Sequence, residues 1–230
     1  MPPDAPAFPA PPYYYRNAQA ISIKFETDPK AALEVLPEPL ELQEPASANL
    51  SVYWYPFSTF GPYHEAILRL YAQYEGNPLT YITQIFVDTE PPMLAGREVW
   101  GYPKKLANIA FTRDKDMIVG MLERPAGVRL ATAVMRPERP AGPLASNGPT
   151  TGLRIIPSAK PDMTGPALAE LIGADSEHTL REAWEGPASI SFPDHSALDP
   201  VDRFPVRAIV KAIYMEYDIL LPAGRVIARL

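Results

Sequence analysis

The fold is decided by three neighbouring stretches rich in aromatic and β-branched residues. They read ANLSVYWYPF (residues 48–57), EAILRLYAQYEG (65–76) and LTYITQIFVD (79–88). These residue types favour extended strands, because their side chains pack well on a pleated, half-buried surface. We therefore predict three successive strands at the centre of the fold.

Strand patterns continue on both sides of this centre. Towards the N-terminus, Ile21, Ile23 and Phe25 alternate with polar residues, which is the period of a half-buried strand. Towards the C-terminus, further strand-like runs are ANIAFTR (107–113), MIVGMLER (117–124), GVRLATAVM (127–135), ISF (190–192) and VRAIVKAIYMEYDILL (206–221). The sequence predicts one β-rich α+β domain over residues 1–230, mainly antiparallel. Closed or partly closed β-barrel architecture is expected, because closure removes exposed strand edges.

A few short peripheral helices are predicted around these strands. Asp28 is a typical helix N-cap, and the helix that it starts must end at Pro37. A second helix is expected over MLAGREVW (93–100), before Pro103. A third is expected around residues 167–172. The 29 prolines mark the ends of many short elements, and residues 136–150 are the best candidate for a long loop.

The composition excludes several kinds of site and partner. There is no cysteine and the three histidines lie far apart, so we expect no metal site and no cofactor. The net charge of −6, with scattered basic residues, argues against nucleic acid and anionic membranes as partners. No apolar run approaches the ~18–20 residues that span a bilayer. The Pro- and Ala-rich start lacks the pattern of a signal peptide, and we expect a soluble, cytoplasmic protein.

Two adjacent lysines, Lys104 and Lys105, stand out in the otherwise apolar run GYPKKL. An amine with the ordinary lysine pKa of about 10.4 is almost entirely protonated at pH 7, so a nucleophilic lysine needs surroundings that disfavour its ammonium form. Burial beside Trp100 and Tyr102 would disfavour the ammonium form and lower the lysine pKa, and a neighbouring cation would lower it further. On a strand, however, Lys105 points away from Lys104, so burial should contribute more. Because lysine pairs are usually solvated, the pair alone does not establish catalysis.

Seven blocks of sequence occur along nearly the whole chain. They are PAFP (6–9), LPEPL (36–40), GPYHE (61–65), DTEP (88–91), GREVWGYPKKL (96–106), EAWEGP (182–187) and DILLP (218–222). In this order they resemble the acetoacetate decarboxylase family, whose signature is GRE…YPKKL. The resemblance implies a mainly antiparallel barrel with peripheral helices, assembly into a homo-oligomer, and a lysine-dependent enzyme that acts on small keto acids.

The resemblance also implies roles for individual residues. Lys104 would form the Schiff base, Lys105 would be the auxiliary cation, and Glu65 would be the pocket glutamate that moves protons. Without the resemblance, a glutamate at the start of a strand is more often solvated. Trp100 is expected in the substrate-binding wall.

The chain departs from the family pattern at two places. Decarboxylases of the family carry a pocket arginine and a second glutamate, and an ungapped count places these at Ala18 and Leu50. Arg16 lies close to the first place and is expected to bind substrate instead. No acidic residue lies near the second. The departures leave the lysine chemistry intact and put the substrate in question.

An iminium ion on Lys104 permits two reactions. Pyruvate could lose a methyl proton, attack an aldehyde co-substrate and then lose water, which is aldolase–dehydratase chemistry. A β-keto acid such as acetoacetate could instead lose CO₂. The departures at Ala18 and Leu50 favour the aldolase–dehydratase, with the decarboxylase as the alternative. A non-catalytic small-molecule binding protein on the same fold is a third possibility, against which the intact lysine pair argues.

Overall fold

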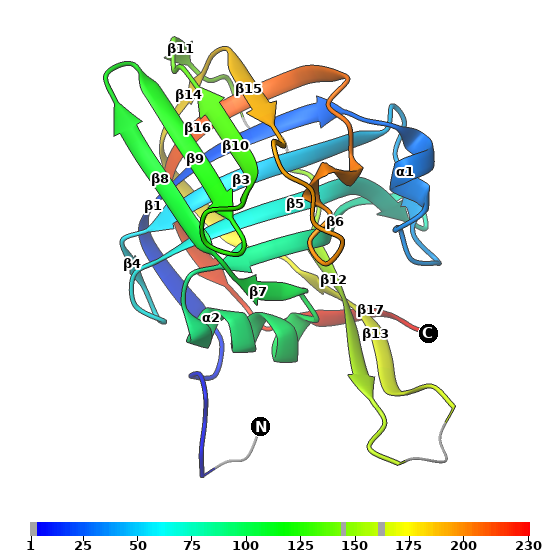
Figure 1. Cartoon of the computed structure of the whole chain (residues 1–230). Coiled ribbons are helices and arrows are strands. Elements are labelled where there is room, and N and C mark those ends of the chain that lie inside the picture. Colours follow the sequence, from blue (N-terminus) through cyan, green and yellow to red (C-terminus); the bar gives the residue numbers. More distant parts are fainter. Residues whose placement is uncertain (1–3, 144–145, 161–163) are drawn as a thin grey trace.

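The computed structural model describes residues 4–143, 146–160 and 164–230, which are organised around one large β-sheet (Figure 1). The order along this sheet is β11 (Arg139–Pro140), β14 (Glu177–Glu185), β16 (Ala208–Leu221), β1 (Tyr13–Glu26), β3 (Ser47–Tyr55), β5 (Tyr63–Tyr74), β6 (Asn77–Val87), β12 (Thr150–Pro157), β13 (Pro166–Ala174) and β17 (Arg225–Arg229). Three short strands join it, namely β2 (Glu41–Leu42) beside β5, β4 (Phe57–Ser58) beside β1 and β7 (Lys104–Leu106) beside β6. The prediction of a β-rich, mainly antiparallel fold is confirmed.

A smaller sheet covers one face of the large one (Figure 1). Its order is β15 (Ala188–Ser191), β10 (Arg129–Met135), β9 (Met117–Glu123) and β8 (Asn108–Asp114). The two sheets approach closely at Gly120, where an added Cβ would lie 2.7 Å from the side chain of Val52. Neither sheet closes on itself within the described ranges, so the closed barrel is not confirmed.

Apolar clusters occupy both faces of the large sheet, and β3 contributes to each. Leu50 and Val52 face the smaller sheet and belong to the core between the two sheets. Tyr53 and Tyr55 belong to a second cluster on the opposite face. This division follows from the strand period of two, which sends successive side chains to opposite faces. The second cluster contains the aromatic residues that surround the candidate site.

The helices are short and lie at the periphery. The first is α1 (Pro29–Leu33), and the Asp28 side chain accepts a hydrogen bond from the Lys30 backbone N–H at 3.2 Å, as its N-cap role predicts. The second is α2 (Glu90–Ala95), which continues as a π-helical turn over Gly96–Trp100. A 3₁₀ turn covers Val201–Arg203. Both helices predicted near Asp28 and over residues 93–100 are therefore present.

The helix predicted around residues 167–172 is wrong, because this segment is part of β13. β13 pairs with β12 on one side and with β17 on the other. Sheet hydrogen bonds on both edges, together with the burial of Leu171 and Ile172, outweigh the modest helix propensity of so short a run. The partner strand β17 lies more than fifty residues further along the chain, so local patterning could not reveal it.

Candidate active site

The strand order of the large sheet brings Lys104 and Glu65 together. β6 lies between β5, which carries Glu65, and β7, which carries Lys104. Lys104 Nζ donates a hydrogen bond to Glu65 Oε2 at 2.6 Å. Only 7% of Lys104 and 5% of Glu65 is exposed, so the pair is largely removed from water. A buried lysine with a carboxylate in direct contact is equipped for proton transfer as well as for nucleophilic attack.

The residues before Lys104 explain the GRE part of the signature. An added Cβ at Gly96 would lie 2.5 Å from Lys104 Cδ, so the glycine leaves the space that the lysine side chain occupies. Arg97 donates from Nη1 to the Lys104 backbone carbonyl at 3.1 Å and fixes the backbone of β7. Gly101 ends the π-helical turn with a φ of 71°, a conformation that favours glycine. The helical turn thus positions the lysine on its strand.

The Lys104–Glu65 pair faces a cavity of about 140 Å³, here called the aromatic cavity. Its aromatic lining includes Tyr15, Tyr53, Tyr55, Trp100, Tyr102 and Tyr217. The rings of Trp100 and Tyr102 stack with their centroids 5.5 Å apart, and so do those of Tyr53 and Tyr55. The cavity therefore combines a mostly apolar wall with several hydroxyl groups, as binding sites for small organic molecules do.

The tyrosine hydroxyls nearest the pair are kept protonated. The Tyr55 hydroxyl lies 3.5 Å from Glu65 Oε1, and the Tyr63 hydroxyl donates to that of Tyr15 at 3.2 Å. Burial raises the pKa of Tyr15 and Tyr55 well above the ordinary phenol value, and the Glu65 charge raises both further. These phenols therefore remain hydrogen-bond donors at physiological pH.

Arg69 also lines the aromatic cavity, and the sequence analysis missed it. It follows Glu65 by four residues on β5, and the strand period places both side chains on the same face. Arg69 Nη2 donates to the Tyr53 hydroxyl at 2.8 Å. Its Nε is shielded from solvent and has no hydrogen-bond partner within the described structure. The spacing from Glu65 was the signal that could have found it.

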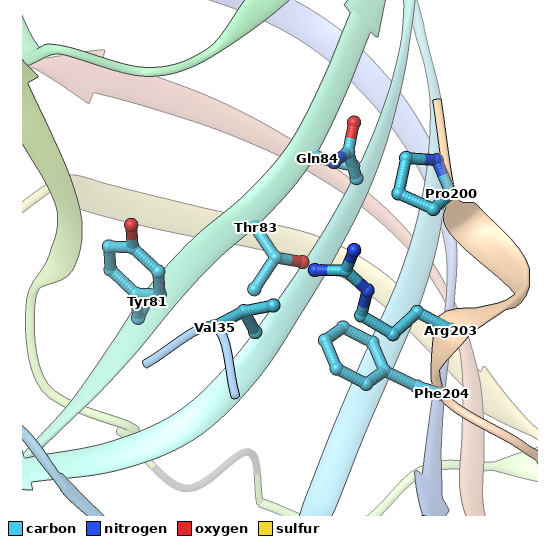
Figure 2. Close-up of a pocket in the computed structure, with 7 residues that line it drawn as sticks. All are labelled: Val35, Tyr81, Thr83, Gln84, Pro200, Arg203 and Phe204. Atoms are coloured by element: carbon cyan, nitrogen blue, oxygen red, sulfur yellow. The ribbon is translucent and has the colours of Figure 1, made fainter. Parts of the chain in front are cut away.

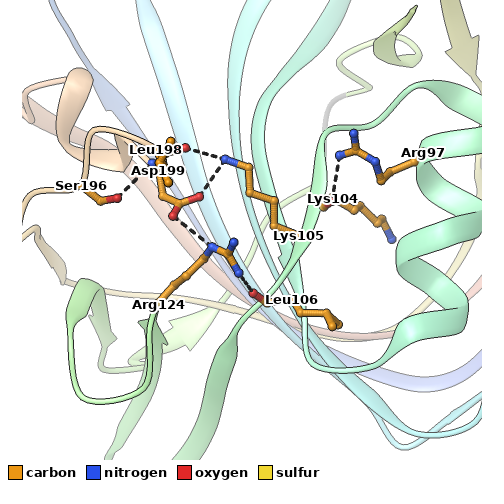
Figure 3. A network of polar contacts seen from close by, with 8 residues as sticks. All are labelled: Arg97, Lys104, Lys105, Leu106, Arg124, Ser196, Leu198 and Asp199. Carbon is orange, nitrogen blue, oxygen red and sulfur yellow. Dashed lines mark hydrogen bonds and ion pairs between the residues drawn. The ribbon is translucent and has the colours of Figure 1, made fainter. Parts of the chain in front are cut away.

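Lys105 lies on the other side of β7. Figure 3 shows the side chains of Lys104 and Lys105 leaving the strand in opposite directions, as the strand period predicts. Lys105 Nζ donates to Asp199 Oδ1 at 2.7 Å and to the Leu198 carbonyl at 2.6 Å. Arg124 Nε donates to the other Asp199 oxygen at 3.0 Å. The structure therefore does not bring the Lys105 amine into the aromatic cavity, and its role as auxiliary cation stays a prediction.

The remaining predicted residues divide between the cavity and the surface. Trp100 lines the aromatic cavity, and its role in substrate binding stays a prediction. Arg16 lies outside it, with its side chain 54% exposed and its Nη1 donating to Asp218 at 3.0 Å. Ala18 belongs to the cluster around the cavity, whereas Leu50 faces the smaller sheet. The ungapped count therefore placed the second glutamate at a position that faces away from the cavity.

A second cavity, of about 180 Å³, opens elsewhere on the large sheet (Figure 2). Figure 2 shows the Arg203 guanidinium pointing toward Thr83 on β6, with Gln84 nearby. Among the described residues that line it there is no lysine, histidine or carboxylate. It therefore offers neither an amine nucleophile nor a carboxylate or imidazole base, and the aromatic cavity is the candidate active site.

A buried lysine–glutamate pair thus lies in an aromatic cavity, on a β-rich fold whose sequence carries GRE…YPKKL. The sequence model of the family described as acetoacetate decarboxylase (ADC) matches residues 1–230. The chain therefore belongs to the acetoacetate decarboxylase family.

Two curated relatives illustrate the sequence similarity. Acetoacetate decarboxylase 2 of Mesorhizobium japonicum is 38% identical over 99% of this chain and 87% of its own length. Acetoacetate decarboxylase of Ralstonia nicotianae is 35% identical over 99% of this chain and 93% of its own length. Both similarities span nearly the whole chain, so they include the site as well as the scaffold.

Solved structures show the same fold. Acetoacetate decarboxylase of Legionella pneumophila superposes with a TM-score of 0.89 at 29% identity, covering 98% of this chain and 90% of that one. The enduracididine biosynthesis enzyme MppR in complex with pyruvate gives a TM-score of 0.79 at 20% identity, covering 96% and 92%. The latter similarity concerns the fold alone.

Within the described residues, each helix is too short or too polar to cross a membrane.

Proposed function

We propose that this protein is a Schiff-base enzyme that decarboxylates a small β-keto acid of the acetoacetate type. Lys104 is the nucleophile and Glu65 is the proton carrier. The observation that carries the proposal is the buried 2.6 Å contact between Lys104 Nζ and Glu65 Oε2 at the wall of a cavity. Full-length relatives named acetoacetate decarboxylase, 34–38% identical, support this reaction.

The charge of the aromatic cavity suits an anionic substrate. Among its described lining residues, Lys104 and Arg69 are cationic and Glu65 alone is acidic, which leaves one positive charge uncompensated. Burial lowers the pKa of His178, and the Arg69 charge lowers it further, so this imidazole is neutral at physiological pH. A keto acid would bring the missing negative charge.

The Lys104–Glu65 pair can carry the reaction through its proton transfers. Attack begins when Glu65 takes a proton from Lys104 across their 2.6 Å hydrogen bond. The neutral amine then adds to the keto carbon, and Glu65 returns the proton to the departing hydroxyl as water leaves. The resulting iminium draws the electron pair of the carbon–carboxylate bond as CO₂ departs. Protonation of the enamine carbon and hydrolysis release the ketone and the lysine.

A second reaction shares the same iminium. With pyruvate, Glu65 would remove a proton from the methyl carbon, and the enamine would attack an aldehyde. The relative MppR is described in complex with the condensation product of pyruvate and imidazole 4-carboxaldehyde. The alanine at position 18 favours the aldolase–dehydratase reaction, because the family resemblance places the pocket arginine of the decarboxylases at that position. This aldolase–dehydratase reaction is our second candidate.

Reductive trapping tests the proposal. Borohydride is added with acetoacetate or pyruvate, and intact mass with peptide mapping locates the adduct. We expect a Lys104 adduct that Lys104→Ala abolishes and that the matched variant Lys105→Ala retains. Proton NMR in heavy water then separates acetone formation from exchange of the pyruvate methyl protons. An absence of adduct with every keto acid would overturn the Schiff-base assignment, and methyl exchange without acetone would replace the decarboxylase with the aldolase–dehydratase.

A further inference from the structure

Arg69 is a cation without an anion. Within the described residues it forms no ion pair, and its Nη2 donates a hydrogen bond to the neutral hydroxyl of Tyr53. The residues close to its guanidinium are the tyrosines Tyr53, Tyr71 and Tyr217, which carry no carboxylate. Arg69 is half-buried, with its Nε shielded from solvent. A guanidinium stays charged at any physiological pH, and withdrawing a charge from water without a partner is unfavourable. An arrangement of this kind is completed by a bound anion.

A carboxylate is the anion that best fits this place. The guanidinium is planar and carries five N–H donors, of which Tyr53 takes one. Two parallel N–H groups match the two oxygens of a carboxylate. Arg69 is half-buried among aromatic rings, and this partial removal from water strengthens such a contact.

Arg69 and Glu65, the partner of Lys104, contact different members of a tyrosine stack. At the Lys104 end, Glu65 lies 3.5 Å from the Tyr55 hydroxyl. At the other end, Arg69 donates to the Tyr53 hydroxyl at 2.8 Å. The Tyr53 and Tyr55 rings lie nearly parallel with their centroids 5.5 Å apart.

This separation bears on the substrate. A carboxylate that leaves as CO₂ must be attached one carbon away from the iminium carbon, and thus lies at the Lys104 end. A carboxylate held by Arg69 must be several bonds further away. Arg69 would also oppose the loss of any carboxylate that it bound, because the negative charge on that group disappears as neutral CO₂ forms. The carboxylate at Arg69 is therefore one that the reaction retains.

We infer that the substrate is a β-keto acid with a second carboxylate at its far end, and that Arg69 determines this specificity by binding the retained group. The inference rests on the proposed Schiff base at Lys104. In the reaction the bond between the α-carbon and the near carboxylate breaks, its electron pair enters the iminium, and a proton replaces CO₂ on that carbon. The distal carboxylate is unchanged, so the product is a keto acid that Arg69 still holds.

Two stable ketones test the inference without requiring decarboxylation. 4-Oxopentanoate carries a distal carboxylate, and 2-pentanone has a methyl group in the same place. Each is titrated against the full chain with borohydride, and the Lys104 adduct is measured by mass. We expect half-maximal trapping at a concentration about 10- to 10²-fold lower for 4-oxopentanoate, as one charged hydrogen-bonding contact provides. Arg69→Gln should bring this ratio close to one, and Arg69→Lys should give an intermediate ratio.

The matched control is Arg113→Gln, because Arg113 is 53% exposed and pairs with Glu216 outside the aromatic cavity. This variant should keep the wild-type ratio. The 2-pentanone adduct reports that Lys104 is still assembled in each variant, and Arg69→Lys preserves the test if Arg69→Gln fails to fold. Equal trapping of both ketones by the wild type, or an unchanged ratio in Arg69→Gln, would overturn the role of Arg69 and leave the Schiff base standing. No adduct with either ketone or with acetoacetate would overturn the proposed function itself.

Discussion

Gly96 offers a direct test of how tightly the lysine is positioned. In Gly96→Ala the added Cβ would lie 2.5 Å from Lys104 Cδ and 2.7 Å from Cε. Non-bonded carbons prefer about 3.5–4.0 Å, so the lysine side chain must move by roughly 1 Å. A 1 Å misplacement of a reacting group can lower the rate by about 10²-fold. We expect kcat/KM for acetoacetate decarboxylation to fall by about that factor, and borohydride trapping to slow with it.

Stability should change much less than activity in Gly96→Ala. Overpacking costs about 1–3 kcal/mol, and alanine recovers about 0.5–1 kcal/mol in a helical turn. Gly142→Ala is the matched control, because an added Cβ there meets no atom within 4 Å. Acetone formation by NMR and urea unfolding measure the two effects. Activity of Gly96→Ala within threefold of the wild type would refute the argument that this glycine makes room for Lys104.

Three further predictions concern ion pairs. Glu65→Gln should slow CO₂ release by about 10²–10⁴-fold, the usual contribution of a positioned acid–base group, as measured by NMR. Asp199→Asn should lower the free energy of unfolding by about 1–3 kcal/mol in urea titrations, because the buried carboxylate accepts from Lys105 and Arg124. Hydrogen bonds from Arg181 lower the pKa of Asp218 from 3.8 to about 2. The Asp218 carboxylate therefore stabilises the fold fully above pH 3.8, and this stabilisation is lost as the pH falls through about 2. Asp218→Asn should lower the free energy of unfolding at pH 7 and leave it unchanged below pH 2.

Local pattern was sufficient where one strand or one turn decides the result. The alternation of Ile21, Ile23 and Phe25 correctly predicted a strand, although β1 extends further towards the N-terminus, to Tyr13. The strand period also predicted that Lys105 points away from Lys104, as Figure 3 shows. The catalytic candidates themselves came from the family resemblance, since a lysine pair and a glutamate are common at protein surfaces.

Non-local pairing set the limit of these predictions. The helix expected at residues 167–172 became β13 because β12 and β17 complete its hydrogen bonds. The barrel was not confirmed because the number of strands does not determine whether the first and last strands pair. Arg69 went unnoticed because, in EAILRL, an arginine among apolar residues resembles the solvent-facing residue of an ordinary strand.

The position of Arg69 shows why the substrate could not be inferred by aligning blocks. The family resemblance places an arginine at Ala18 on β1, whereas this chain presents an arginine to the aromatic cavity from β5. The iminium chemistry that we propose uses Lys104 and Glu65, which are in contact. An arginine on a different strand approaches the bound keto acid from a different side and therefore selects a different arrangement of carboxylates. The reaction centre and the specificity of such a cavity can thus change independently, because different strands supply them.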